Sequence, residues 1–152
     1  MIESAKNSVS HVRAAEERDF EAIARLAGEL GYPSSLDQVS ERLMTIEGNP
    51  HHAVFVAEGP GGDVLGWIHV TETRTLENDP RAEITGLVVD ANYRGAAIGA
   101  SLLNRCEEWA RSRNLNTVGV RSNVIRDRAH SFYERLGYTV VKSQKVFRKI
   151  LI

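Results

Sequence analysis

The segment from Val88 to Ala100 carries residue types suited to binding a phosphate group. An apolar run ends at Val89, a short stretch rich in glycine and alanine follows, and a helical pattern begins almost at once. Small residues let a ligand approach the backbone, and the first N–H groups of a helix have no partner within it. Together with the helix dipole and the guanidinium of Arg94, these N–H groups would bind a phosphate or pyrophosphate. A strand-to-helix junction without a ligand would suit similar residues, so both interpretations stay open at this point.

Several other kinds of site are disfavoured by the residues present. The chain contains no Gly-Lys-Ser or Gly-Lys-Thr, which excludes a Walker loop, and the glycine-rich stretch does not fit the dinucleotide fingerprint Gly-x-Gly-x-x-Gly. His51 and His52 are adjacent and would face opposite sides of a strand, and no cluster has the spacing of metal ligands, so we expect no metal. Cys106 falls on the apolar stripe of a helix, which favours a packing thiol over a nucleophile.

Hydrophobic periodicity predicts the elements that would position the segment. Strands are expected near 9–14, 53–57, 64–70, 82–89, 117–120, 138–141 and 145–150, and helices near 16–30, 35–46, 98–113 and 126–136. Ser35 and Gln38 have the spacing of a capping box at the start of the second helix. This order combines hairpins with strand–helix–strand crossovers. It therefore predicts an α+β fold with a mixed, mostly antiparallel sheet and helices on both faces.

Composition limits the class of protein without naming its chemistry. The 152 residues are 42% hydrophobic and 26% charged with a formal net charge of −1, which is typical of one globular domain spanning 1–152. Near-neutral charge gives no general attraction to nucleic acid or to a membrane surface. The single cysteine precludes an internal disulfide, and neither a signal peptide nor a membrane-spanning run is evident. We therefore expect a soluble, cytoplasmic protein.

Two motifs resemble those of the GNAT superfamily of acetyl-CoA-dependent N-acetyltransferases. Arg94-x-x-Ala97-x-Gly99 resembles the family signature Arg/Gln-x-x-Gly-x-Gly/Ala, with alanine in place of the first glycine. Because alanine keeps its backbone N–H, we expect this change to be tolerated. The stretch 129–138, Ala-His-Ser-Phe-Tyr-Glu-Arg-Leu-Gly-Tyr, is similar to the last helix of the family, and 82–89 to its fourth strand. The resemblance implies about six or seven strands, four helices, and fourth and fifth strands that splay apart.

The resemblance places acetyl-CoA between the splayed strands. Backbone groups next to a bulge at Gly86 would pair with the pantetheine arm, and the N–H of Leu87 or Val88 would stabilise the oxyanion. The loop and helix start would hold the pyrophosphate, Asn123 the pantetheine arm, and Arg126 a nucleotide phosphate. The full set of residues implied for acetyl-CoA is Leu87, Val88, Val89, Arg94, Gly95, Ala96, Ala97, Ile98, Gly99, Ala100, Asn123 and Arg126.

The resemblance also implies two catalytic residues. Tyr133 corresponds to a tyrosine that protonates the departing thiolate, although an aromatic residue in a helix can equally be a packing residue. Glu83 lies where several family members place a carboxylate base, although a strand glutamate is more often a solvated or ion-paired side chain. Strand alternation predicts that Glu83, Thr85 and Leu87 share one face of the strand.

The implied function is direct transfer of an acetyl group from acetyl-CoA to a primary amine within a ternary complex. The acceptor is expected to be a small polar molecule, with pairing into a homodimer as an option common in the family. Three alternatives stay open: a non-catalytic CoA sensor, an acetyltransferase for protein lysines or N-termini, and an unrelated phosphate-ligand protein. Turnover of acetyl-CoA with amines would separate the enzyme from the sensor.

Overall fold

The computed structural model describes residues 11–94, 96–121 and 127–152. It divides the chain into two compact units, Met1–Arg121 and Ser122–Ile152, which are considered separately below. The single domain expected over residues 1–152 stays a prediction.

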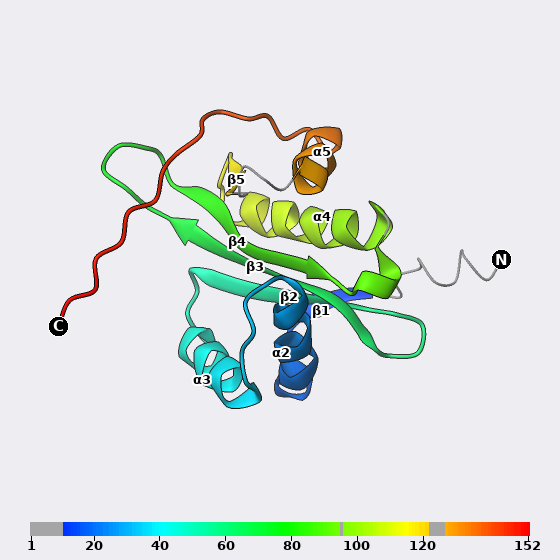
Figure 1. Ribbon diagram of the computed structural model, residues 1–152. Helices are drawn as coiled ribbons and strands as arrows, with labels where there is room; N and C mark the ends of the chain where they lie inside the picture. The colour runs from blue at the N-terminus through cyan, green and yellow to red at the C-terminus, as the bar shows by residue number, and fades with distance from the viewer. Residues whose placement is uncertain (1–10, 95, 122–126) are drawn as a thin grey trace. The chain divides into compact units, whose positions relative to one another are not determined.

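The first unit contains one five-stranded sheet with the strands in chain order (Figure 1). The strands are β1 (His11–Ala14), β2 (His52–Glu58), β3 (Val64–Thr73), β4 (Arg81–Val89) and β5 (Val118–Val120). Strands β1 to β4 pair antiparallel, and β5 pairs parallel with β4 because α4 carries the chain across one face of the sheet. The predicted mixed, mostly antiparallel sheet is confirmed.

Helices cover both faces of this sheet (Figure 1). Helices α2 (Phe20–Glu29) and α3 (Leu36–Ile46) lie on one face and α4 (Ala96–Ser112) on the other. The short 3-10 helices η1 (Glu17–Asp19) and η2 (Ala91–Tyr93) precede α2 and α4.

The helix ends follow the sequence signals. The predicted capping box is present, since the side chain of Ser35 accepts the Gln38 N–H and that of Gln38 accepts the Ser35 N–H. Gly31, with φ +97°, follows α2 in a conformation that side chains rarely adopt, so glycine suits the position that ends this helix.

The core lies on both sides of the sheet. Buried side chains from the helices and the central strands include Leu26, Val56, Ile68, Val70, Ile84, Ile98, Leu102 and Leu103. Cys106 is fully buried among them, and burial raises the pKa of its thiol to about 12. A thiol that stays protonated cannot act as a nucleophile, which confirms its expected packing role.

The second unit contains one helix, α5 (Asp127–Arg135), which agrees with the predicted helix near 126–136. The strands predicted at 138–141 and 145–150 are wrong, because the described chain after Gly137 forms neither helix nor strand. Alternating apolar residues give this segment strand propensity, yet a strand also needs a hydrogen-bonded partner. Its apolar side chains are exposed, Phe147 at 89%, and the described sheet has five strands instead of six or seven.

Candidate functional site

Strand β4 contains a β-bulge at Thr85. Gly86 lies opposite His69 and Ile84 opposite Val70, so Thr85 has no residue opposite it on β3. Its hydroxyl donates to the His69 carbonyl oxygen at 3.3 Å. A Cβ on Gly86 would lie 2.8 Å from the Trp67 ring, so glycine is required there for close packing. The bulge implied at this point of the strand is therefore present.

The bulge reverses the alternation of side chains along β4. Glu83 lies opposite Thr71 and Gly86 opposite His69, so both share one face of the sheet, whereas Leu87 lies opposite Ile68 on the other. The prediction that Glu83, Thr85 and Leu87 share a face is therefore wrong. A bulge adds one residue to a strand, which shifts every later side chain to the opposite face.

The half of β4 beyond the bulge is unpaired on one edge in the described chain. Pairing with β5 stops at Ile84 and Val120, whereas β4 continues to Val89. The Asp90 N–H donates to Leu65 of β3, and N–H groups alternate between the two edges of a strand. The N–H groups of Leu87 and Val89 therefore point to the open edge and that of Val88 points to β3. Of the two candidate oxyanion donors, Leu87 alone has its N–H on the edge of β4 that is unpaired in the described chain.

A buried carboxylate shapes the loop between β4 and α4. Asp90 is 7% exposed, accepts the Asn92 N–H at 3.0 Å, and forms an ion pair with Arg25 at 3.1 Å. Sequence reasoning did not single out this residue, although Asp90 and Asn92 have the spacing of an Asx turn. The loop is thereby tied to α2, which fixes the path of the chain into Arg94.

The groups after this loop fit an anion. Arg94 is exposed, and its guanidinium makes no hydrogen bond or ion pair with any residue that the structure describes. Ala97 is exposed, so its methyl group does not fill space that the core needs, whereas Ile98 and Gly99 are buried and Ala100 is half-buried. The described part of this donor set, backbone N–H groups beside a free guanidinium, suits a pyrophosphate.

Four predicted binding positions are not placed by the structure. Gly95, Asn123 and Arg126 lie outside the described residues, as does the side chain of Ala96. Their roles stay predictions.

Glu83 is held by two arginines. Arg81 Nε lies 3.2 Å from Glu83 Oε2, and Arg121 Nε lies 3.3 Å from Oε1. The Glu83 side chain is 15% exposed, whereas that of Arg121 is 75% exposed. Both oxygens are therefore engaged in ion pairs. This arrangement fits the ion-paired interpretation of Glu83 better than the interpretation as a free base.

A histidine that sequence reasoning missed lies next to the bulge. His69 Nε2 lies 3.0 Å from His52 Nδ1, and the two rings stack with centroids 5.2 Å apart. Burial, and then the neighbouring His52, lowers the pKa of His69 to about 4. His69 is therefore neutral at neutral pH. Hairpin register would have found the pair, since positions 52 and 69 are diagonal neighbours across β2 and β3.

The neutral state of His69 predicts acid sensitivity. Between the unfolded pKa of 6.5 and the folded pKa of about 4, the unfolded chain binds more protons at this position. Stability should therefore fall as the pH drops through that window, by up to about 1.4 kcal/mol per pH unit. Urea unfolding at several pH values should give a steeper loss of stability in the wild type than in His69→Gln. Equal slopes would contradict the prediction.

Tyr133 lies in the second unit. It is half-buried in α5, and its ring makes edge contacts with Phe132 at 5.2 Å and with Tyr138 at 5.9 Å between centroids. The Tyr138 N–H donates to the Tyr133 carbonyl oxygen at 3.0 Å, which closes the helix. Its predicted role as an acid stays a prediction.

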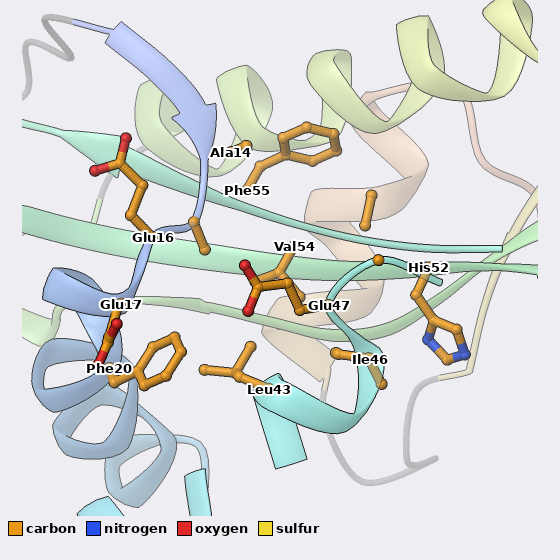
Figure 2. Close-up of a pocket in the computed structure, with 13 residues that line it drawn as sticks. Ala14, Glu16, Glu17, Phe20, Leu43, Ile46, Glu47, His52, Val54 and Phe55 are labelled. Atoms are coloured by element: carbon orange, nitrogen blue, oxygen red, sulfur yellow. The ribbon is translucent and has the colours of Figure 1, made fainter. Parts of the chain in front are cut away.

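A cavity of about 240 Å³ opens between the β1–β2 edge of the sheet and helices α2 and α3 (Figure 2). Apolar side chains form its walls, among them Phe20, Leu43, Ile46 and Val54. Three carboxylates, Glu16, Glu17 and Glu47, and the imidazole of His52 supply its polar groups. An apolar pocket with a few polar groups is the usual form of a small-molecule site. Glu16 is paired with Arg18 at 2.6 Å, whereas the carboxylates of Glu17 and Glu47 make no ion pair within the described residues and favour a cation.

Other kinds of site find no support in the described residues. They contain no group of three or more His, Cys, Asp or Glu side chains that could hold a metal ion. Within the same residues, no helix has the length and apolarity to cross a bilayer.

The family model for the acetyltransferase (GNAT) family matches residues 13–138. The chain therefore belongs to the GNAT family, as its motifs suggested. A solved aminoglycoside N-acetyltransferase in complex with CoA superposes with a TM-score of 0.82 over 91% of this chain and 93% of that one. At 16% identity this likeness shows the fold alone.

Two curated relatives are similar to this chain over most of their own length. An aminoalkylphosphonate N-acetyltransferase of Salmonella typhimurium is 32% identical over 114 residues, covering 74% of this chain and 71% of that protein. An aminoglycoside N(6')-acetyltransferase of Stenotrophomonas maltophilia is 25% identical over 145 residues, covering 93% and 94%. Against other curated relatives, the chain spans 38% of an N-acetyltransferase of Methanocaldococcus jannaschii and 25% of the N-acetylaspartate synthetase of Mus musculus.

Proposed function

We propose that the protein transfers an acetyl group from acetyl-CoA directly to a small primary amine. The observation that carries the proposal is the open edge of β4, where the N–H groups of Leu87 and Val89 point away from β3. The strand leads into a loop with Arg94, whose guanidinium makes no ion pair within the described residues, and then into the start of a long helix. An extended ligand with an anionic end would therefore find main-chain partners along the strand and phosphate donors at its end.

Within this proposal acetyl-CoA supplies an activated acyl group, and the chain orients it. Backbone groups of Leu87 and Val89 pair with the extended arm, and the Leu87 N–H donates to the thioester oxygen as negative charge develops there. Asn123 and Arg126 bind the arm and a nucleotide phosphate, and Tyr133 protonates the departing sulfur. The pyrophosphate group is held by Arg94, Gly95, Ala96, Ala97, Ile98, Gly99 and Ala100.

Removing the Leu87 N–H should slow the reaction selectively. Proline lacks this donor and is tolerated in a strand where its nitrogen faces an unpaired edge. We expect Leu87→Pro to lower kcat by about 100- to 1,000-fold, the usual effect of losing one oxyanion donor. Leu87→Ala keeps the N–H and serves as the matched control for the lost side chain. A folded Leu87→Pro protein with the kcat of Leu87→Ala would refute this assignment.

The acceptor is proposed to be cationic, because an amine is protonated at neutral pH and the carboxylates of Glu17 and Glu47, which make no ion pair within the described residues, would attract it to this face of the sheet. The names of the two relatives of similar length, which contain aminoalkylphosphonate and aminoglycoside, support a small molecule over a protein. A small polar amine is therefore the class to test first.

A CoA sensor without turnover is the second candidate. The observation in its favour is the ion pairing of Glu83 with Arg81 and Arg121, which occupies the carboxylate expected to act as a base. The two functions predict different outcomes in one experiment. Release of free thiol from acetyl-CoA would be followed with a panel of polyamines, aminoglycosides, aminoalkylphosphonates and amino acids. Amine-dependent release supports the enzyme, whereas CoA binding in calorimetry without release on any amine supports the sensor.

A further inference from the structure

Two histidines connect the cavity with the bulge in β4. His52 lies on the cavity wall (Figure 2), and its Nδ1 is 3.0 Å from Nε2 of His69. His69 lies directly opposite Gly86, and its carbonyl oxygen accepts the hydroxyl hydrogen of Thr85, the residue that leaves the ladder. A path of two imidazoles therefore runs from the bulge to the cavity.

The contact between the rings leaves one nitrogen free on each. Since His69 uses Nε2 and His52 uses Nδ1, the remaining nitrogens are His69 Nδ1 and His52 Nε2. An imidazole can take a proton on one nitrogen and release another from its second nitrogen. When the Nε2 hydrogen of His69 is donated to His52, the pair can pass a proton without leaving a lasting charge on the half-buried ring.

We propose that His69 accepts a proton from the acceptor amine and that His52 passes it to the cavity. The inference rests on the proposed acetyl transfer. The ammonium nitrogen gives one proton to His69 Nδ1, His69 gives its Nε2 proton to His52 Nδ1, and His52 releases its Nε2 proton. The neutral nitrogen then attacks the thioester carbon, the C–S bond breaks, and the second proton lost by nitrogen balances the one gained by sulfur.

Charge around the two rings gives the transfer its direction. His69 lies on the central strand β3 and is half-buried, which disfavours a positive charge on its ring. His52 borders the cavity, whose lining includes the carboxylates of Glu16, Glu17 and Glu47. Neither the Glu17 nor the Glu47 carboxylate makes a hydrogen bond or ion pair that the described residues show. Figure 2 shows the Glu47 carboxylate projecting from the end of α3 in front of Val54, inside the cavity. The half-buried position of His69 therefore disfavours a lasting positive charge on its ring, whereas the side on which the proton leaves carries carboxylates.

Glu83 is less suited than His69 to accept the proton of the amine. Both Glu83 oxygens are within 3.3 Å of an arginine nitrogen, so proton acceptance there would break an ion pair. The free nitrogen of neutral His69 carries no such partner among the described residues. Glu83 is then a positioning residue, which links β4 through Arg121 to the chain that follows β5.

The test compares His69→Gln and His52→Gln with the control His51→Gln. His51 is the sequence neighbour of His52, but its ring pairs with Glu72. With an amine that the wild type acetylates, we expect His69→Gln to lower kcat/KM by about 100-fold or more and His52→Gln by about tenfold. The double variant should be no slower than His69→Gln, because both residues serve one path. His51→Gln should retain the wild-type rate.

Two further measurements distinguish proton transfer from a structural effect. With hydroxylamine as the acceptor, which is largely neutral at pH 7, the loss in His69→Gln should be much smaller than with a strongly basic amine. Calorimetric binding of CoA should be unchanged in all variants. An equal loss with both acceptors, or full activity of His69→Gln, would overturn the relay. Absence of turnover by the wild type on every amine would instead refute the proposed function.

Discussion

Replacing Tyr133 by phenylalanine is expected to lower kcat by about 100- to 10,000-fold, the range found when a general acid is lost. The departing thiolate is the conjugate base of a thiol with a pKa of about 8.5. At neutral pH the thiol is therefore the stable product, so the thiolate must gain a proton as it departs. A free phenol has a pKa of about 10, so it gives this proton only when the site stabilises the resulting phenolate or destabilises the thiolate. In the proposed role Tyr133 would supply the hydrogen, which phenylalanine lacks.

Tyr138→Phe is the matched control, since that tyrosine is also half-buried in the second unit and its ring contacts that of Tyr133. The control should keep kcat within a few-fold of wild type. Measuring the pH dependence of kcat adds a second readout, because loss of an acid removes the fall in rate at high pH. If Tyr133→Phe turns over amines at the wild-type rate, the acid is another group.

Replacing Asp19 by alanine is expected to destabilise the first unit by about 3–5 kcal/mol, as when one partner of a buried ion pair is removed. Asp19 is 3% exposed and accepts two hydrogen bonds from the Arg13 guanidinium, at 2.7 and 2.9 Å, and one from the Glu16 N–H at 2.8 Å. These contacts join β1 to the start of α2, and Arg13 also reaches Glu58 on β2 at 3.0 Å. Alanine would leave the guanidinium buried without its main partner.

The matched control is Arg18→Ala, which removes an exposed pair with Glu16 and should cost less than about 1 kcal/mol. Burial raises the pKa of Asp19, but hydrogen bonds from Arg13 and the Glu16 N–H outweigh it, so the folded pKa lies below the ordinary value of 3.8. The stabilisation is therefore present above the unfolded pKa and is lost as the pH falls through the folded one. Urea unfolding at pH 7 and below 4 measures both effects. A loss under 1 kcal/mol at pH 7 would contradict the prediction.

Local signals explain why much of the fold could be predicted. The Ser35–Gln38 capping box and Gly31 after α2 act within a few residues, so their physics is contained in the sequence. The prediction of strands at 138–141 and 145–150 was wrong because strand formation does not depend on local sequence alone. Their apolar alternation is local, but a strand exists only where a second strand accepts and donates its hydrogen bonds.

The candidate site divides along the same line. The phosphate site predicted at Arg94, the small residues after it and the family motifs are all patterns of consecutive residues, so they could be recognised from the sequence alone. The tertiary structure decided which N–H groups of β4 reach the open edge. One extra residue at Thr85 inverts the strand, and the bulge exists only through pairing with β3. It also paired His52 with His69 and engaged Glu83 with two arginines. These contacts join residues distant in sequence, and only strand register brings them together.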